Sequence, residues 1–83
     1  MSVESIISLA GNQRRVLRLT ILDGSRQEKV IEVEPYSRQR TDQGFQLLCR
    51  DRIDPGYRII CLTDILAAEL TPYEFVPRLP VTV

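Results

Sequence analysis

Two short runs of alternating apolar residues constrain the fold of this chain more than any other feature. Apolar side chains occupy every second position from Phe45 to Cys49, and again from Tyr57 to Cys61. Because successive side chains of a strand point to opposite faces, each run predicts a strand with one apolar face. Asp54-Pro55-Gly56 separates the two runs and favours a turn. The pair therefore predicts a β-hairpin, whose inward side chains are Phe45, Leu47, Cys49, Tyr57, Ile59 and Cys61.

The N-terminal residues 1–11 predict a short helix. Ser2 has the side chain to cap a helix over residues 3–10, and Gly11 is expected to end it. Residues 65–70 (Ile-Leu-Ala-Ala-Glu-Leu) also have helical propensity, but they follow a series of strands. We therefore expect one helix at the N-terminus and a fifth strand at 65–70.

A second hairpin is predicted between this helix and the central pair of strands. Apolar residues alternate over residues 16–22 and 29–34, and Pro35 is expected to end the second strand. A two-residue Asp-Gly turn would split the two apolar faces, whereas a five-residue loop over 23–27 keeps them together. The expected register pairs Leu17 with Val33, Leu19 with Ile31 and Arg18 with Glu32.

The segments that flank the central hairpin are more polar or richer in proline. Residues 36–43 are expected to be extended before a turn that ends at Gly44, and the tail over 71–83 contains three prolines. Tyr73 and Phe75 in this tail have two interpretations. They either fold back on the core or contact a second subunit.

A short helix followed by five strands predicts the fold class. In a chain of 83 residues this order indicates a single, mainly β domain over residues 1–83. The expected architecture is a small, partly open five-stranded barrel of the Sm-like or SH3 type, with the helix at 1–11, the barrel at 16–70 and an extended tail at 71–83.

Arginine dominates the basic residues of this chain. Ten of its eleven basic residues are arginine, and eleven acidic residues cancel their charge. The zero net charge argues against nucleic-acid binding driven by bulk charge. The planar arginine fork suits phosphate and carboxylate groups, although codon bias in a GC-rich genome explains the same excess.

Several classes of protein are disfavoured by what the sequence lacks. It has no histidine and two cysteines, so we expect no metal site, no cofactor and no enzyme activity. A Cys49–Cys61 disulfide is disfavoured, because the register that pairs them also places Arg52 opposite Arg58. No apolar run reaches the roughly 18–20 residues of a membrane span, and the first residues lack a basic secretory start. We therefore expect a cytoplasmic protein with no membrane partner.

Three segments resemble the WYL domain family in their order and spacing: Val33–Ser37, Gly44–Leu47 and Tyr57–Ile65. The family takes its name from a Trp-Tyr-Leu triplet after a turn, where this chain has Phe45-Gln46-Leu47. The N-terminal helix with its Arg-Arg-Val-Leu run is similar to the opening of the family, and Glu69–Phe75 is similar to its closing segment.

This resemblance implies an Sm-like, SH3-type ligand-sensing module. Members of the family usually follow a helix-turn-helix domain in bacterial transcription regulators, and their basic pocket is thought to bind nucleic acid or a nucleotide-like ligand. Arg58 matches the arginine that opens the fourth strand of the family, Tyr36 and Ser37 match the segment after Glu-Pro, and Arg50 lies just past the triplet. No helix-turn-helix is present in these 83 residues, so action through another chain is expected.

The chain also departs from the family pattern. The triplet keeps only Leu47, Cys61 stands where a second arginine is frequent, and Thr63-Asp64-Ile65 replaces Asp-Arg-Ile. These departures imply the loss of several basic positions. A divergent ligand, weaker anion binding and a purely architectural role all fit them.

The leading hypothesis is a regulatory module whose Arg18, Arg50 and Arg58 share one outward face and bind an oligonucleotide or nucleotide-like ligand. The complete set of expected ligand-binding residues is Arg58, Arg50, Arg18, Tyr36, Ser37 and Gln46. One alternative is an interaction module, a homodimer or a subunit of a regulator, that uses a strand edge or the tail. The other alternative is an Sm-like RNA-binding protein.

Overall fold

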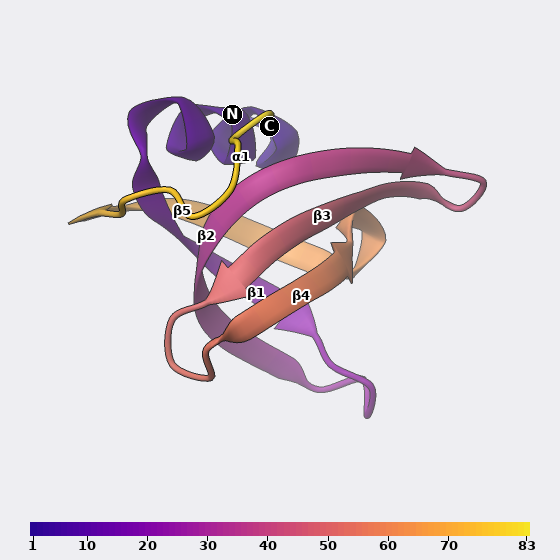
Figure 1. Cartoon of the computed structure of the whole chain (residues 1–83). Helices are drawn as coiled ribbons and strands as arrows, with labels where there is room; N and C mark the ends of the chain where they lie inside the picture. The colour runs from indigo at the N-terminus through magenta and orange to yellow at the C-terminus, as the bar shows by residue number, and fades with distance from the viewer.

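Five antiparallel strands form one curved sheet with a single helix packed against it in the computed structural model, which describes residues 1–83 (Figure 1). The strand order is β4-β3-β2-β1-β5, so β4 and β5 are the edges and the sheet is not closed. The mainly β class with one short helix is confirmed. No helix of the chain is long and apolar enough to cross a membrane. The elements are α1 (Val3–Gln13), β1 (Arg15–Leu22), β2 (Glu28–Thr41), β3 (Gly44–Asp51), β4 (Gly56–Cys61), the 3-10 turn η1 (Leu62–Asp64) and β5 (Ile65–Glu74).

The β1–β2 hairpin has the register that the alternating residues predict. Five residues, 23–27, connect the strands, and the carboxylate of Asp23 accepts hydrogen bonds from the backbone N–H groups of Ser25 and Gln27. This bonding stabilises the loop and keeps the apolar faces aligned. The confirmed cross-strand pairs are Leu17 with Val33, Leu19 with Ile31 and Arg18 with Glu32.

Helix α1 begins as predicted but ends later. Ser2 Oγ accepts a hydrogen bond from the N–H of Ser5, which confirms the N-cap. Gly11 does not end the helix, because α1 continues to Gln13 and Arg14 adopts the left-handed conformation at φ 55°. A Cβ atom at Gly11 would lie 2.0 Å from Cγ2 of Val83, so this glycine is required by packing against the C-terminus.

Strand β2 does not end at Pro35. It continues to Thr41, and its register with β3 shifts between Pro35 and Ser37. Tyr36 is the extra residue of this bulge, and its side chain is buried. A bulge lets a strand accommodate a proline that has no N–H to donate, so the predicted strand end is wrong.

The register of the β3–β4 hairpin corrects the central prediction. Leu47 pairs with Ile60 and Cys49 with Arg58, so the expected inward residues of the two strands do not lie opposite one another. Ile60 is therefore buried with Leu47 and Cys49, whereas Ile59 is 64% exposed. The expected inward positions of Tyr57, Ile59 and Cys61 are wrong, and Phe45 is partly exposed near the β2–β3 turn.

A carboxylate explains this register. Asp51 Oδ1 accepts hydrogen bonds from the N–H groups of Ile53 and Asp54, which closes a four-residue turn between Asp51 and Gly56. The turn fixes which residues face each other, and a shift of one residue moves every side chain of β4 to the other face.

Strand β5 confirms the expected fifth strand and extends it. Residues 65–70 are in β5, which continues to Glu74 and pairs with β1. Pro72 lies in this edge strand, where a missing N–H is tolerated. Phe75 folds back on the core, with its ring edge-on to Tyr36 at a centroid distance of 5.8 Å. Tyr73 stays half exposed.

Candidate anion-binding site

Charged side chains line the face of the sheet that lies opposite the apolar core. On β1, β2 and β3 the core-facing residues alternate with Arg18, Glu32, Glu34 and Arg50. Arg18 is paired with Glu32 across β1–β2, and Glu34 is paired with Arg50 across β2–β3. Directly paired residues lie on the same face of a sheet, so this outer face carries both arginines.

Glu32 binds two arginines. Its Oε2 lies 2.9 Å from Nη2 of Arg18, and its Oε1 lies 3.2 Å from Nη1 of Arg52. Arg18 also lies 3.8 Å from Glu69 on β5. The hydrogen bond with Glu32 raises the pKa of Arg18, and the two carboxylates act in the same direction. Arg18 and Arg52 are therefore already engaged by carboxylates.

Glu34 holds its two arginines more loosely. The carboxylate of Glu34 is nearly buried and accepts a hydrogen bond from the hydroxyl of Tyr36. Arg50 approaches it at 3.8 Å and Arg78 at 3.9 Å, both beyond hydrogen-bond distance. The guanidinium groups of Arg50 and Arg78 make no hydrogen bond within the chain, so their donors remain available.

We call Arg18, Arg50, Arg52 and Arg78 the outer arginine cluster. It places four guanidinium groups against three carboxylates, those of Glu32, Glu34 and Glu69. One positive charge is thus in excess on a surface of a chain whose net charge is zero. This local excess, rather than the bulk charge, makes the face attractive to an anion.

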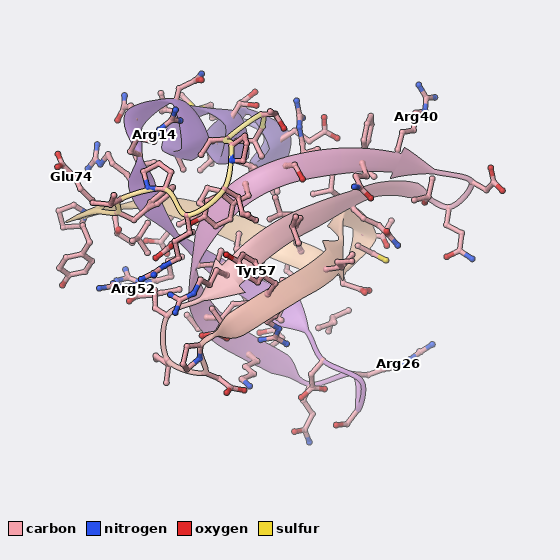
Figure 2. The ribbon with its side chains drawn as sticks, viewed as in Figure 1. Arg14, Arg26, Arg40, Arg52, Tyr57 and Glu74 are labelled. Atoms are coloured by element: carbon pink, nitrogen blue, oxygen red, sulfur yellow. The ribbon has the colours of Figure 1, made fainter.

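Two half-exposed tyrosines border the cluster. Tyr57 is paired with Arg50 across β3–β4, and the ring of Tyr73 lies 5.2 Å from Cζ of Arg52. Both tyrosines are 50% exposed. Figure 2 shows Tyr57 in front of the strands, with Arg52 to its left near the end of the sheet. The face therefore combines guanidinium groups with accessible aromatic rings.

Tyr36 is buried beneath this face and positions groups that lie on it. Burial raises its pKa to about 12, and the hydrogen bond to Glu34 adds to the shift. The same hydroxyl accepts a hydrogen bond from the backbone N–H of Arg78 at 3.1 Å. Because its side chain is only 1% exposed, Tyr36 positions Glu34 and Arg78 rather than reaching solvent.

Arg58 does not share the outer face. It is paired with Cys49, which is buried, and its guanidinium donates to Oδ2 of Asp51 at 3.1 Å. The prediction that Arg18, Arg50 and Arg58 share one face is therefore wrong for Arg58. The one-residue register shift of β4 causes this difference.

The remaining expected site residues lie on the outer face but farther along the strands. Ser37 is paired with Leu48, and Gln46 with Cys61, both toward the β2–β3 turn. Gln46 Nε2 lies 3.9 Å from the sulfur of Cys61. The structure thus brings Arg18, Arg50 and Tyr36 together, and it adds Arg52 and Arg78, which strand alternation did not indicate.

A polar groove lies between α1 and β2, apart from the outer arginine cluster. This groove has a volume of about 620 Å³ and is lined mainly by polar side chains, among them Ser5, Ser8, Asn12 and Arg38. Arg38 is its one guanidinium group and lies 3.6 Å from Glu4. The groove therefore has fewer guanidinium groups for an anion than the outer arginine cluster has.

The two cysteines are free. Burial raises the pKa of Cys49 to about 12, which keeps this thiol protonated near neutral pH. Cys61 is half-buried on β4, across from Gln46 rather than beside Cys49. No group of three or more Cys, Asp or Glu side chains is placed to hold a metal ion.

The fold and the outer arginine cluster define a small, mainly β domain with a charged sheet face. A domain of this fold occurs in proteasome accessory factor B/C (PafBC) of Arthrobacter aurescens, with a TM-score of 0.78 and 17% sequence identity over 98% of this chain. The chain spans 15% of the length of that PafBC chain. The likeness at this identity is one of fold. No protein-family model and no curated protein matches the chain.

Proposed function

We propose that this chain is a non-catalytic regulatory module of the WYL type, with an Sm-like, SH3-type architecture. In this proposal it binds an anionic, nucleic-acid or nucleotide-like ligand on its outer arginine cluster and acts through a partner such as a transcription regulator. The sequence resemblance to the WYL family and the fold likeness to an accessory factor support the regulatory role.

The observation that carries the proposal is the unused hydrogen-bonding capacity of Arg50 and Arg78. Both guanidinium groups lie beside Glu34 without hydrogen-bonding to it. A phosphate between them would accept charge-assisted hydrogen bonds from both arginines. A base of the same ligand would stack on Tyr57, which lies across from Arg50.

The net charge of the chain limits how many phosphate contacts can contribute to binding on this face. The chain has zero net charge, so binding depends on a few contacts rather than on a broad basic surface. We therefore expect a short single-stranded oligonucleotide or a nucleotide to fit better than a long duplex. The salt dependence should correspond to about two or three phosphate contacts.

Binding of a labelled single-stranded oligonucleotide, measured by fluorescence anisotropy, tests the proposal. Arg50→Ala is expected to weaken binding about tenfold or more, because one charge-assisted hydrogen bond contributes about 1.5–3 kcal/mol. Arg58→Ala is expected to bind as the unaltered chain does, since Arg58 lies on the other face. Arg26→Ala, in the exposed loop after β1, is the matched control.

Two results would contradict this proposal. The first is an absence of saturable binding for oligonucleotides and nucleotides alike. The second is a loss of binding in Arg58→Ala together with normal binding in Arg50→Ala. Thermal melting of each variant separates a loss of contact from a loss of folded protein.

The free edge of the sheet favours a second candidate function, self-association. Strand β4 has no partner on one side and contains no proline, and its single charge, Arg58, is paired with Asp51. Exposed Tyr57 and Ile59 lie on the same strand. Such unprotected edge strands pair readily with another chain.

Light scattering across a concentration series tests self-association through β4. If it occurs, the measured mass should rise toward a dimer, and Ile59→Lys should keep the chain monomeric. Val76→Lys, at a residue that is 85% exposed outside the strands, should not change the mass. A monomer at all concentrations would remove this candidate.

A further inference from the structure

Arg78 belongs to the outer arginine cluster, but it lies outside the sheet. It belongs to the C-terminal tail (residues 76–83), which turns back after β5 and crosses β2 toward α1 (Figure 1). Two hydrogen bonds, both donated by backbone N–H groups of the tail, attach it to the bulge residue of β2, one to its side chain and one to its backbone. The N–H of Arg78 donates to the hydroxyl of Tyr36 at 3.1 Å, and the N–H of Thr82 donates to the Tyr36 carbonyl at 2.7 Å.

The end of the tail is held by a second contact on α1. Val83 packs over Gly11, where a Cβ atom would lie 2.0 Å from Cγ2 of Val83 and 3.1 Å from Cγ1 of Val81. Gly11 belongs to α1, whereas Arg50 and Arg78 lie at Glu34 on β2. Because Gly11 has no side chain, the tail that carries Arg78 can pack against α1 at this position.

The start of the tail is weakly attached. Val76 is 85% exposed, and no backbone hydrogen bond involves residues 76 or 77. Segments with few contacts open locally at a low free-energy cost. The contacts with Tyr36 at one end and with Gly11 at the other would therefore govern any local opening of the tail.

We propose that the docked tail completes the anion site, so that ligand binding and tail docking are coupled. In this inference, which rests on the proposed function, Gly11 is a positioning residue that acts through Val83 and Arg78. When the tail is undocked, the site loses Arg78 and retains Arg50 as the one guanidinium beside Glu34. The ligand binds the docked state more tightly and raises its population.

Coupling of this kind is reciprocal. If undocking of the tail weakens ligand binding by a given factor, saturating ligand shifts the docking equilibrium of the tail by the same factor. Hydrogen exchange at the amides of Arg78 and Thr82 reports docking, because both donate to Tyr36. Hydrogen exchange therefore measures docking of the tail independently of ligand affinity.

Gly11→Leu tests the proposal in the whole 83-residue chain, with a short labelled single-stranded oligonucleotide as the probe. The new side chain occupies the space of Val83, and leucine favours the helix more than glycine does. We expect faster exchange at Thr82 and binding weakened about tenfold, the loss of one charge-assisted contact. Asn12→Leu, at the exposed neighbouring position on the same helix, should change neither.

Val83→Glu provides a second variant that opens the tail without altering α1, and Val76→Glu is its exposed control. The proposal also predicts that the oligonucleotide slows exchange at Arg78 and Thr82 in the unaltered chain. Unchanged affinity in Gly11→Leu and Val83→Glu, with their tail amides exchanging rapidly, would overturn the inference and leave the proposed function standing. An unaltered chain that binds no anionic probe would remove the proposed function and this inference with it.

Discussion

Replacing Ile60 with alanine is expected to lower the free energy of unfolding by about 2–4 kcal/mol, whereas Ile59→Ala should change it by less than about 1 kcal/mol. The two residues are neighbours of the same type on β4. Ile60 is 7% exposed and pairs with Leu47 over the core, but Ile59 is 64% exposed. Removing buried methylene groups leaves a cavity, and removing exposed ones does not.

Urea denaturation followed by circular dichroism measures this difference. Because the two substitutions are chemically identical and adjacent, each serves as the control for the other. Equal effects would contradict the burial of Ile60 alone, and a larger effect from Ile59→Ala would indicate the alignment in which Tyr57, Ile59 and Cys61 face inward. That alignment would also move Arg58 to the face of Arg50, so the result bears directly on the site.

Asp51→Ala is expected to lower the free energy of unfolding by about 2–3 kcal/mol. Its side chain, only 6% exposed, accepts hydrogen bonds from the N–H groups of Ile53 and Asp54 and from the guanidinium of Arg58. Removing the carboxylate leaves the turn donors and Arg58 without this partner. Arg58 is 37% exposed and partly hydrated, which keeps the expected loss below that of a fully buried ion pair.

The same group predicts a pH dependence. Burial of Asp51 favours its neutral form, but the hydrogen bonds from Ile53, Asp54 and Arg58 together outweigh burial and hold its pKa below the ordinary value of 3.8. A carboxyl group whose folded pKa is lowered stabilises the fold fully above its unfolded pKa. The stability advantage over Asp51→Asn should therefore be complete at neutral pH and should shrink as the pH falls below about 3.8.

Chemical denaturation at a series of pH values checks both expectations for Asp51. Asp54→Ala, at an exposed residue of the same turn whose carboxylate has no ion-pair partner, is the control and should have a small effect. The difference in the free energy of unfolding between the unaltered chain and Asp51→Asn should not grow as the pH falls. Such growth would contradict the assigned hydrogen bonds. An effect of Asp51→Ala no larger than that of Asp54→Ala would do so too.

The contrast between the two hairpins explains which parts of the fold could be predicted. On β1 and β2 the apolar residues share one parity, so a single register buries Leu17, Leu19, Ile31 and Val33 together. On β4 apolar residues occur at both parities, because Ile59 and Ile60 are adjacent. Alternation then cannot choose the face, and the hydrogen bonds of Asp51 within the turn decide it.

Only those residues of the candidate site whose face follows from strand alternation could be predicted. Arg18 and Arg50 were expected on the outer face and are there, whereas Arg58 followed the incorrect register of β4. Arg78 could not be predicted, because its position depends on a tail without regular structure. That tail is held by long-range contacts with Tyr36 and Gly11, which leave no periodic signal in the sequence.

Nuclear magnetic resonance titration of the isotope-labelled chain with a short single-stranded oligonucleotide reports on every backbone amide at once and therefore locates any anion site. We expect saturable shifts centred on the outer arginine cluster and on Tyr57, with little change at Arg58, Asp51 or the groove beside Arg38. Shifts centred on Arg58 or on that groove, or no saturable shifts at any position, would contradict the proposed anion site.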